Sequence, residues 1–269
     1  MFRRFFPVLL MAILVGCFDP QEGCLDIAAV NYYPAADEDC CCRYPKLIIN
    51  ADQTYDTQLF KQDSLYPTAD GHLFRIKSIA FYLSEFQLFK NGNVFLMGDS
   101  LEFKTYDAAQ NDTISRLFTD DFTLIRRVPF ANQVASFRED GAFDQIRFRL
   151  GLNESAETII PSLTASSHPL YPQKENLYQQ GFVFFQAVVV RDSAALTAPD
   201  TLNFFRQDLP DLFITGQGDF IHQIGTDFTL TLHADWSRLF DGVNWTVHDI
   251  PAWKSKIVAN MPSVFSVTP

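Results

Sequence analysis

Four of the five cysteines lie in one short stretch, as Cys24, Cys40, Cys41 and Cys42. Thiols this close together either pair as disulfides or bind a soft metal ion such as Cu(I) as thiolates. With four cysteines there are three pairings, and each joins Cys24 to one member of the triplet. A disulfide closing a loop of this length stabilises a chain by about 3 kcal/mol in the chain-entropy model. Disulfides are commoner than thiolate sites outside the cytoplasm, so the stretch favours disulfides.

Histidine is the other metal-ligand type in the chain, and its five copies are His72, His168, His222, His233 and His248. No two of them have the spacing H-x-H, H-x₃-H or H-E-x-x-H, which would bring both imidazoles to one metal ion. A histidine metal site must therefore be assembled by the fold. For each histidine taken alone, a surface or hydrogen-bonded ring is the simpler interpretation.

A serine block offers nucleophilic chemistry. Met97-Gly98-Asp99-Ser100-Leu101 follows a predicted strand and is similar to the nucleophile block of the GDSL esterases. Gly151-Leu152-Asn153-Glu154 and Asp219-Phe220-Ile221-His222 are similar to later blocks of that family. Those esterases need helices that alternate with strands, whereas residues 102–106 continue as a strand after Ser100. Four-letter matches also arise by chance, so an esterase is a remote alternative and we expect no enzyme.

The N-terminus has the pattern of a secretory signal peptide. Arg3 and Arg4 precede an apolar run over residues 5–15, which is too short to span a bilayer. The run ends in Leu14-Val15-Gly16-Cys17, which resembles a bacterial lipobox. In such signals the peptide is cut before the cysteine, so residues 1–16 are removed and Cys17 carries lipid. The alternatives are a signal cut elsewhere and a lone buried cysteine.

The charge of the chain limits its partners. Loss of residues 1–16, which include Arg3 and Arg4, changes the net charge from −11 to about −13. An acidic chain without a basic block cannot neutralise phosphates, so nucleic acid is excluded as a partner and anionic membrane surfaces repel it. No stretch after Val15 reaches the ~20 apolar residues of a membrane helix. We therefore expect a globular domain that is held to a membrane by its lipid.

The rest of the chain reads mostly as strands. Alternating or continuous apolar runs predict strands at residues 46–50, 73–89, 94–97, 122–128, 143–152, 182–190 and 228–233. Within residues 73–89 the alternation slips in phase before Phe86, and residues 182–190 are apolar at almost every position, as in a central strand. Helical periodicity is limited to residues 235–240 and 252–260. This pattern predicts one all-β domain over residues 46–269, an antiparallel β-sandwich with one or two short helices.

An acidic cluster precedes the cysteine triplet. Asp26, Asp37, Glu38 and Asp39 could hold Ca²⁺ through carboxylate oxygens, although a solvated acidic turn is favoured because the spacing is not that of an EF-hand loop. Residues 23–45 resemble a short module of exported proteins, G-C-x-D-x-x-A-x-N-Y-x-P-x-A…C-x-Y-P. Cys42 matches its closing cysteine, so the resemblance implies a Cys24–Cys42 disulfide. The pairing of Cys40 and Cys41 stays open.

Three further blocks carry a resemblance to a larger family. They are Phe81-Tyr82-Leu83-Ser84-Glu85-Phe86-Gln87-Leu88, Phe143-Asp144-Gln145-Ile146-Arg147-Phe148-Arg149-Leu150-Gly151, and His168-Pro169-Leu170-Tyr171 leading to Gly181-Phe182-Val183-Phe184. In this order they resemble the MbnP-like family of exported copper-binding proteins over about residues 46–269. The resemblance implies a β-sandwich, and in some members copper held by histidines and an oxidised tryptophan.

The metal site that this resemblance implies is incomplete here. His168 matches the H-P-L-Y block and His222 resembles a later H-x-G stretch, so these two are the expected copper ligands. The M-Y-W-x-W segment of the family is replaced by Asn176-Leu177-Tyr178-Gln179-Gln180, which has no tryptophan. The usual context of the family would add a TonB-type receptor or a dihaem peroxidase as partner.

The sequence thus predicts a non-enzymatic binding or accessory lipoprotein of the bacterial cell envelope. A lipid on Cys17 would hold it at the periplasmic or outer-membrane surface, and the following residue, Phe18, does not tell which membrane it is. Copper is the expected ligand. The alternative is a structural, interaction or glycan-binding β-sandwich without a metal.

Overall fold

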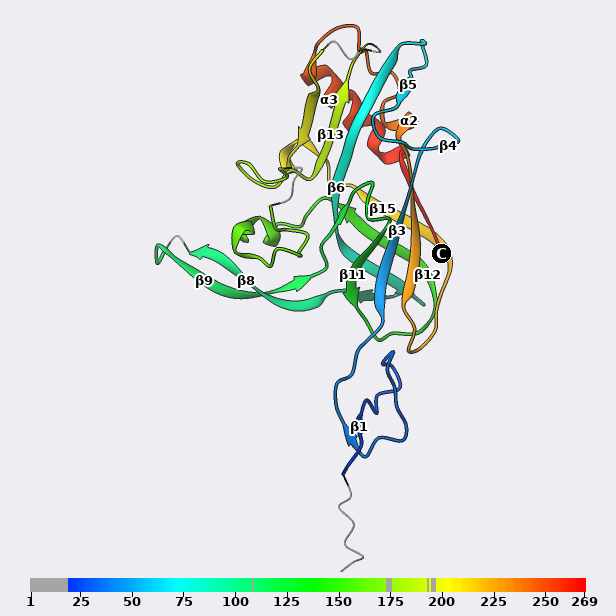
Figure 1. Ribbon diagram of the computed structural model, residues 1–269, viewed down its shortest axis with the longest axis vertical. Helices are drawn as coiled ribbons and strands as arrows, with labels where there is room; N and C mark the ends of the chain where they lie inside the picture. The colour runs from blue at the N-terminus through cyan, green and yellow to red at the C-terminus, as the bar shows by residue number, and fades with distance from the viewer. Residues whose placement is uncertain (1–18, 108, 173–175, 193, 195–196) are drawn as a thin grey trace, which may run out of the picture.

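The structure, a computed structural model, describes residues 19–107, 109–172, 176–192, 194 and 197–269. The predicted signal peptide, residues 1–16, and the predicted lipidation site, Cys17, lie outside the described residues. Two β-sheets share one core and form the body of the protein, and a small module of residues 19–45 extends from one end (Figure 1). The predicted all-β sandwich with one or two short helices is confirmed.

The larger sheet is built around its longest strand, β6 (Leu73–Lys90). Its strand order is β14-β13-β6-β12-β15, and three short strands also pair with β6. Every pairing in this sheet is antiparallel. The other strands are β5 (Leu65–Pro67), β7 (Asn93–Leu96), β10 (Thr123–Ile125), β12 (Gly141–Leu150), β13 (Phe185–Val190), β14 (Asp200–Phe204) and β15 (Phe213–His222).

The smaller sheet has the order β11-β3-β16-β17, with β4 paired to β3. It departs from the predicted antiparallel arrangement at one place, because β3 and β16 run parallel. A parallel pair needs a long connection, and nearly the whole domain lies between these two strands in sequence. The strands are β3 (Lys46–Tyr55), β4 (Gln58–Leu59), β11 (Ala131–Ser136), β16 (Phe228–Asp235) and β17 (Phe265–Thr268).

The remaining elements lie around the two sheets. Strands β8 (Asp99–Asp107) and β9 (Asp112–Asp120) form a hairpin that projects sideways from the body (Figure 1). The helices are α2 (Trp236–Leu239), α3 (Ile250–Asn260) and the 3₁₀ turns η2 (Ser155–Thr158), η3 (Pro161–Leu163), η4 (Arg206–Asp208) and η5 (Met261–Ser263). Of the helices in the described ranges, none has the length and apolar character needed to span a membrane.

Aromatic side chains dominate the core between the sheets. Trp236 is fully buried, and its ring meets those of Phe60, Phe81, Phe185 and Phe265 at centroid distances of 6.0 to 6.4 Å. A second core lies on the opposite face of β6, where loops, the residues just before β13 and the β8–β9 hairpin cover the sheet. Strand β13 is buried on both faces over much of its length, as its continuous apolar run predicts.

A β-bulge explains the slip in apolar phase within β6. Phe81 and Leu83 face the main core, and after the slip Phe86 and Leu88 face it again. The pairing of β12 with β6 shifts register at this point, and Glu85 adopts a φ of 56°. An extra residue in one strand restores the inward direction of the side chains that follow it. A second shift, between Ile76 and Ser78 against β13, was not predicted from the sequence.

The carboxyl group of Asp121 holds the bulge from outside the strand. Its Oδ2 accepts a hydrogen bond from the Glu85 N–H at 2.6 Å, and the Phe86 N–H also donates to this carboxyl group. Asp121 is only 4% exposed, and its Oδ1 has no hydrogen-bond partner among the described residues. Burial raises the pKa of Asp121 to about 7, against the lowering effect of the two N–H donors. The carboxyl group is therefore protonated in the folded protein over a pH range in which the unfolded chain ionises.

We expect Asp121→Asn to remove a pH dependence from stability. A pKa of about 7 in the folded state and 3.8 in the unfolded chain means that folding takes up a proton between these values. The full contribution of Asp121 is present below pH 3.8, and up to about 4 kcal/mol is lost as the pH rises to 7. Urea unfolding from pH 4 to 7 should show this decline relative to the variant.

The exposed Asp144→Asn on β12 serves as the control and should leave the slope unchanged. Parallel stability curves for the wild type and Asp121→Asn would contradict the role of Asp121.

Candidate functional site

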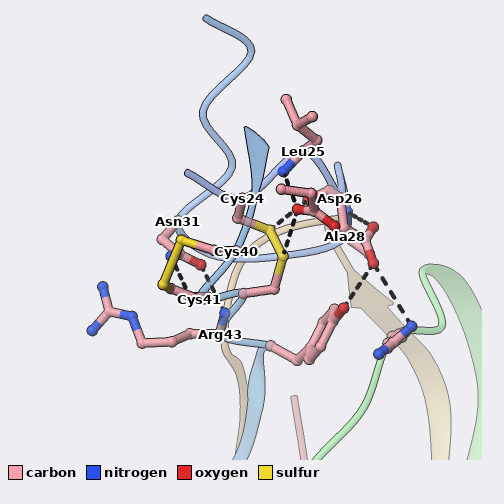
Figure 2. Close-up of a disulfide and its surroundings, with 12 residues drawn as sticks. Cys24, Leu25, Asp26, Ala28, Asn31, Cys40, Cys41 and Arg43 are labelled. Atoms are coloured by element: carbon pink, nitrogen blue, oxygen red, sulfur yellow. Dashed lines mark hydrogen bonds and ion pairs between the residues drawn. A yellow bond between two sulfur atoms is a disulfide. The ribbon is translucent and has the colours of Figure 1, made fainter. Parts of the chain in front are cut away.

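The cysteine-rich module is closed by two disulfides (Figure 2). Cys24 pairs with Cys42 across 18 residues, with an S–S distance of 2.10 Å and a Cα–Cα distance of 4.8 Å. Cys40 pairs with its neighbour Cys41. Cys24 is fully buried and Cys41 is exposed, so the two disulfides differ in their access to solvent. The structure therefore contains the pairing that the module resemblance implies, and it also joins the other two thiols.

The acidic side chains of the module hold its backbone. Asp26 Oδ1 accepts from the Ala28 N–H at 2.9 Å, Asp37 Oδ2 from Gln21 at 3.0 Å and Asp39 Oδ1 from Leu25 at 2.9 Å. Each carboxylate thus replaces the hydrogen bonds that a larger sheet would supply. In the described part of the chain, the two clusters of three ligand-type side chains are Glu22 with Cys40 and Cys41, and Cys24 with Asp39 and Cys42. Within the described residues Asp26, Asp37, Glu38 and Asp39 do not form such a cluster among themselves, and three of them accept backbone N–H groups.

A salt bridge and a stacked ring attach the module to the sandwich. Arg138, from the loop after β11, places its guanidinium 3.7 Å from the centroid of the Tyr44 ring. The Tyr44 hydroxyl donates to Asp26 Oδ2 at 2.9 Å, and Arg138 Nη1 lies 3.7 Å from the same oxygen. The Ala28 N–H, then the Tyr44 hydroxyl, and Arg138 hold the pKa of Asp26 below its ordinary value. The Lys46 N–H also donates to Asp227 Oδ1 at 2.8 Å, just before β16.

His222 joins the two loops on which the module rests. Its Nδ1 lies 2.6 Å from the Glu139 carbonyl oxygen, and its Nε2 lies 2.7 Å from that of Thr226. The ring is 3% exposed and packs at 4.4 Å from the centroid of Phe137. Gly225, in the same turn, lies against the module, because an added Cβ would come 3.3 Å from the Ala29 carbonyl oxygen. His222 therefore connects backbone segments beneath the module.

His168 lies in a different environment, beside the β8–β9 hairpin. Its Nδ1 accepts from the Leu170 N–H at 3.1 Å, so the proton resides on Nε2, which donates to Asp120 Oδ1 at 3.1 Å. The ring meets the edge of Phe103 at a centroid distance of 5.1 Å. A copper ligand must offer a nitrogen lone pair, and the ring nitrogens of His168 and His222 are engaged in hydrogen bonds to different elements. The arrangement does not fit a shared copper site at these two histidines.

The other three histidines also have polar partners. His72 Nε2 lies 2.6 Å from the Arg191 carbonyl oxygen. His233 Nδ1 and His248 Nε2 each lie 3.0 Å from a carboxylate oxygen, of Asp52 and Asp200 respectively. A hydrogen-bonded histidine was the simpler expectation for each of them.

Ser100 lies within a strand rather than at a strand-to-helix turn. It belongs to β8 and pairs with Thr119 of β9, and the strand continues to Asp107. Asp219 and His222, the residues of the later esterase-like block, lie on β15. The nucleophile turn that the esterases require is not formed at Ser100.

Arg138 and Asp121 are the structurally decisive residues that sequence reasoning missed. No sequence pattern indicates the role of Arg138, because its partners Asp26 and Tyr44 lie about a hundred residues earlier in the chain. Asp121 could have been found from the phase slip before Phe86, since a bulge leaves backbone donors that need an acceptor.

Comparison with known proteins gives one distant structural likeness. No protein-family model matches the chain, and no curated protein matches it. Among solved structures, MbnP from Methylosinus trichosporium is similar, with a TM-score of 0.47 and 11% sequence identity over 82% of this chain and 97% of that chain. A likeness this weak carries no inference about activity. Membership of the MbnP-like family stays a prediction.

The blocks behind that prediction fall on neighbouring strands. Residues 81–88 lie in β6, residues 143–151 lie mainly in β12, and residues 181–184 lead into β13, while β12 and β13 flank β6. Most of their apolar side chains are buried in one of the two cores. The sequence resemblance therefore concerns the scaffold, and its implications for a ligand depend on His168 and His222 alone.

We expect the double change Cys24→Ser and Cys42→Ser to loosen the module but not the sandwich. The lost disulfide closes a loop with a sequence separation of 18, which corresponds to about 3 kcal/mol. Hydrogen exchange should show faster exchange of the amides at residues 21–44, with a nearly unchanged thermal transition of the sandwich.

Cys40→Ser with Cys41→Ser is the matched control, because a disulfide between adjacent residues closes almost no loop. Equal loss of protection in both double variants would contradict this assignment of stability to Cys24–Cys42.

Proposed function

We propose that this chain is a lipid-anchored extracytoplasmic binding protein in which the cysteine-rich module separates the β-sandwich from the membrane. The observation that carries the proposal is the Cys24–Cys42 disulfide with its buried Cys24, because disulfides form and persist mainly in oxidising compartments. The module lies between the predicted lipidation site, Cys17, and β3, the first strand of the sandwich. Its salt bridge to Arg138 supports a fixed rather than a loose spacer.

The placement of the polar residues supports a binding rather than a catalytic role. Ser100 lies in β8 opposite Thr119 of β9, and His168 and His222 hold loops together through hydrogen bonds. A catalytic base needs a nitrogen directed at a substrate, which neither ring offers in this arrangement. The envelope partners expected from the family, a TonB-type receptor or a dihaem peroxidase, stay predictions.

We expect Cys17→Ala to release the protein from the membrane. Metabolic labelling with a radioactive or alkyne fatty acid should mark the wild type and not the variant, because the acyl chains are attached to this thiol. Fractionation should move the variant into the soluble fraction. Unchanged labelling and membrane association in the variant would refute the lipidation site. Cys40→Ser with Cys41→Ser controls for nonspecific labelling of other thiols.

Copper binding is the second candidate function, and the clustering of thiol and carboxylate groups in the module favours it. Cys40, Cys41 and Glu22 present three ligand atoms within 4.8 Å of one another. Sulfur in a disulfide is a poor ligand, but two electrons and two protons convert the Cys40–Cys41 disulfide to two thiols, which bind Cu(I) as thiolates. A phosphine supplies the electrons and becomes a phosphine oxide, while one water molecule supplies the oxygen atom and the two protons.

We expect Cu(I) to bind only after this reduction. Anaerobic titration against a chromophoric chelator should show no stoichiometric binding by the oxidised protein, and binding by protein that was reduced and freed of phosphine. Cys40→Ser with Cys41→Ser should abolish that binding, whereas His168→Ala with His222→Ala should retain it. Tight binding by the oxidised protein that the histidine variant loses would instead establish a histidine site.

A further inference from the structure

A polar hollow of about 500 Å³ opens on the outer face of the larger sheet. Strand β13, which contributes to it, lies at the end of the sandwich away from the cysteine-rich module (Figure 1). Strands β6, β13 and β14 form its floor, through Ser78, Gln186, Thr201 and Asn203 among others. The loop that precedes β13 forms one side. The size lies within the range of small-molecule binding sites in proteins.

The floor side chains are ordered by strand register. Val188 pairs with Ser78 of β6 on one side and with Thr201 of β14 on the other, so these three form one row across the sheet. Gln186 pairs with Asn203 and lies in the next row on the same face, since side chains two apart in a strand point the same way. The inward-facing residues between them belong to the main core. A rigid sheet therefore holds these polar groups.

Gln186 is the polar exception in an apolar strand. It is only 4% exposed, and its Nε2 donates to Asn203 Oδ1 at 2.9 Å. Burying a carboxamide costs free energy unless it is hydrogen-bonded, and Gln186 is hydrogen-bonded to Asn203. An apolar side chain would fill this position in the strand without needing such a partner. The hydrogen bond fixes the orientation of both amides at the floor of the hollow.

The loop wall is fixed by its own buried anchor. Leu177 is 1% exposed in the second core, and its carbonyl oxygen accepts from the Val183 N–H at 2.9 Å. The flanking Asn176 and Gln179 line the hollow. Four carboxamides thus surround it, together with two hydroxyls and one valine. Among the lining residues that the structure describes, none is charged, although a fifth of the chain consists of charged residues.

We propose that this hollow binds a neutral saccharide, an inference that deepens the proposed binding function and rests on it. Each carboxamide has a donor and an acceptor side by side, which matches adjacent sugar hydroxyls that both donate and accept. The seven lining residues within the described ranges carry no charge, which favours an uncharged ligand. A peptide would be held through a strand edge or an apolar pocket, whereas these groups lie on the face of paired strands.

The test uses the full mature chain and a panel of neutral oligosaccharides, namely maltotriose, cellotriose, xylotriose, mannotriose and N-acetylchitotriose. Saturation-transfer NMR should detect at least one of them at ~10 mM or below, and titration calorimetry should give its affinity. Asn176→Ala with Gln179→Ala should weaken that affinity about tenfold, because both side chains are exposed and their hydrogen bonds to the ligand are lost. Gln217→Ala, an exposed amide on β15, should leave it unchanged.

Absence of binding across the panel would overturn the proposal, and so would affinity that is insensitive to the double change. Preference for an anionic oligosaccharide such as trigalacturonate would overturn the neutral class. Thermal unfolding of each variant shows whether the fold is kept. Membrane fractionation of Cys17→Ala separates the two proposals: saccharide binding without lipid anchoring would refute the anchor alone, and anchoring without binding would refute the saccharide site alone.

Discussion

The hydrogen bonds from the Glu85 and Phe86 N–H groups to the buried Asp121 carboxyl group support the whole sandwich. Every strand of the larger sheet except β14 and β15 pairs directly with β6, and those two attach through β13 and β12. A one-residue slip in such a strand would turn its later apolar side chains out of the core. The bulge prevents this, and Asp121 satisfies the backbone groups that the bulge leaves without ladder partners. A buried carboxyl group is tolerated here because it stays protonated over much of the acidic range.

The outer face of the larger sheet, around β6, has an apolar part and a polar part. At one end the second core lies against β6 and includes Tyr82 of that strand together with Leu177 and Phe184. At the other end the cover stops, and the face is lined by amides and hydroxyls. Leu177 connects the two parts, because its burial in the second core sets the position of the loop that borders the hollow. The polar hollow thus begins where the apolar cover of the second core ends.

The module relies on a different source of order. It has one two-residue strand pair and little apolar core, so disulfides and side-chain caps replace the sheet ladder. Its attachment joins Asp26, Tyr44 and Arg138, and the loops beneath it are tied by His222. A histidine that resembled a copper ligand in sequence thus serves as a connection between loops. Local chemistry builds the module, and long-range contacts orient it on the sandwich.

Local pattern in the sequence was enough for β3, β6, β7, β10, β12, β13 and β16, the phase slip in β6 and both α-helices, since alternation acts over a few positions. Strands β9, β11, β14 and β17 were not predicted. The Cys24–Cys42 pairing followed from a motif resemblance. The parallel pairing of β3 with β16, the second bulge near Ser78, the docking through Arg138 and the row of amides beside Gln186 depended on residues brought together from distant parts of the chain. Which distant residues pair is decided by tertiary packing. The free energy of each such contact depends on which other surfaces are buried with it.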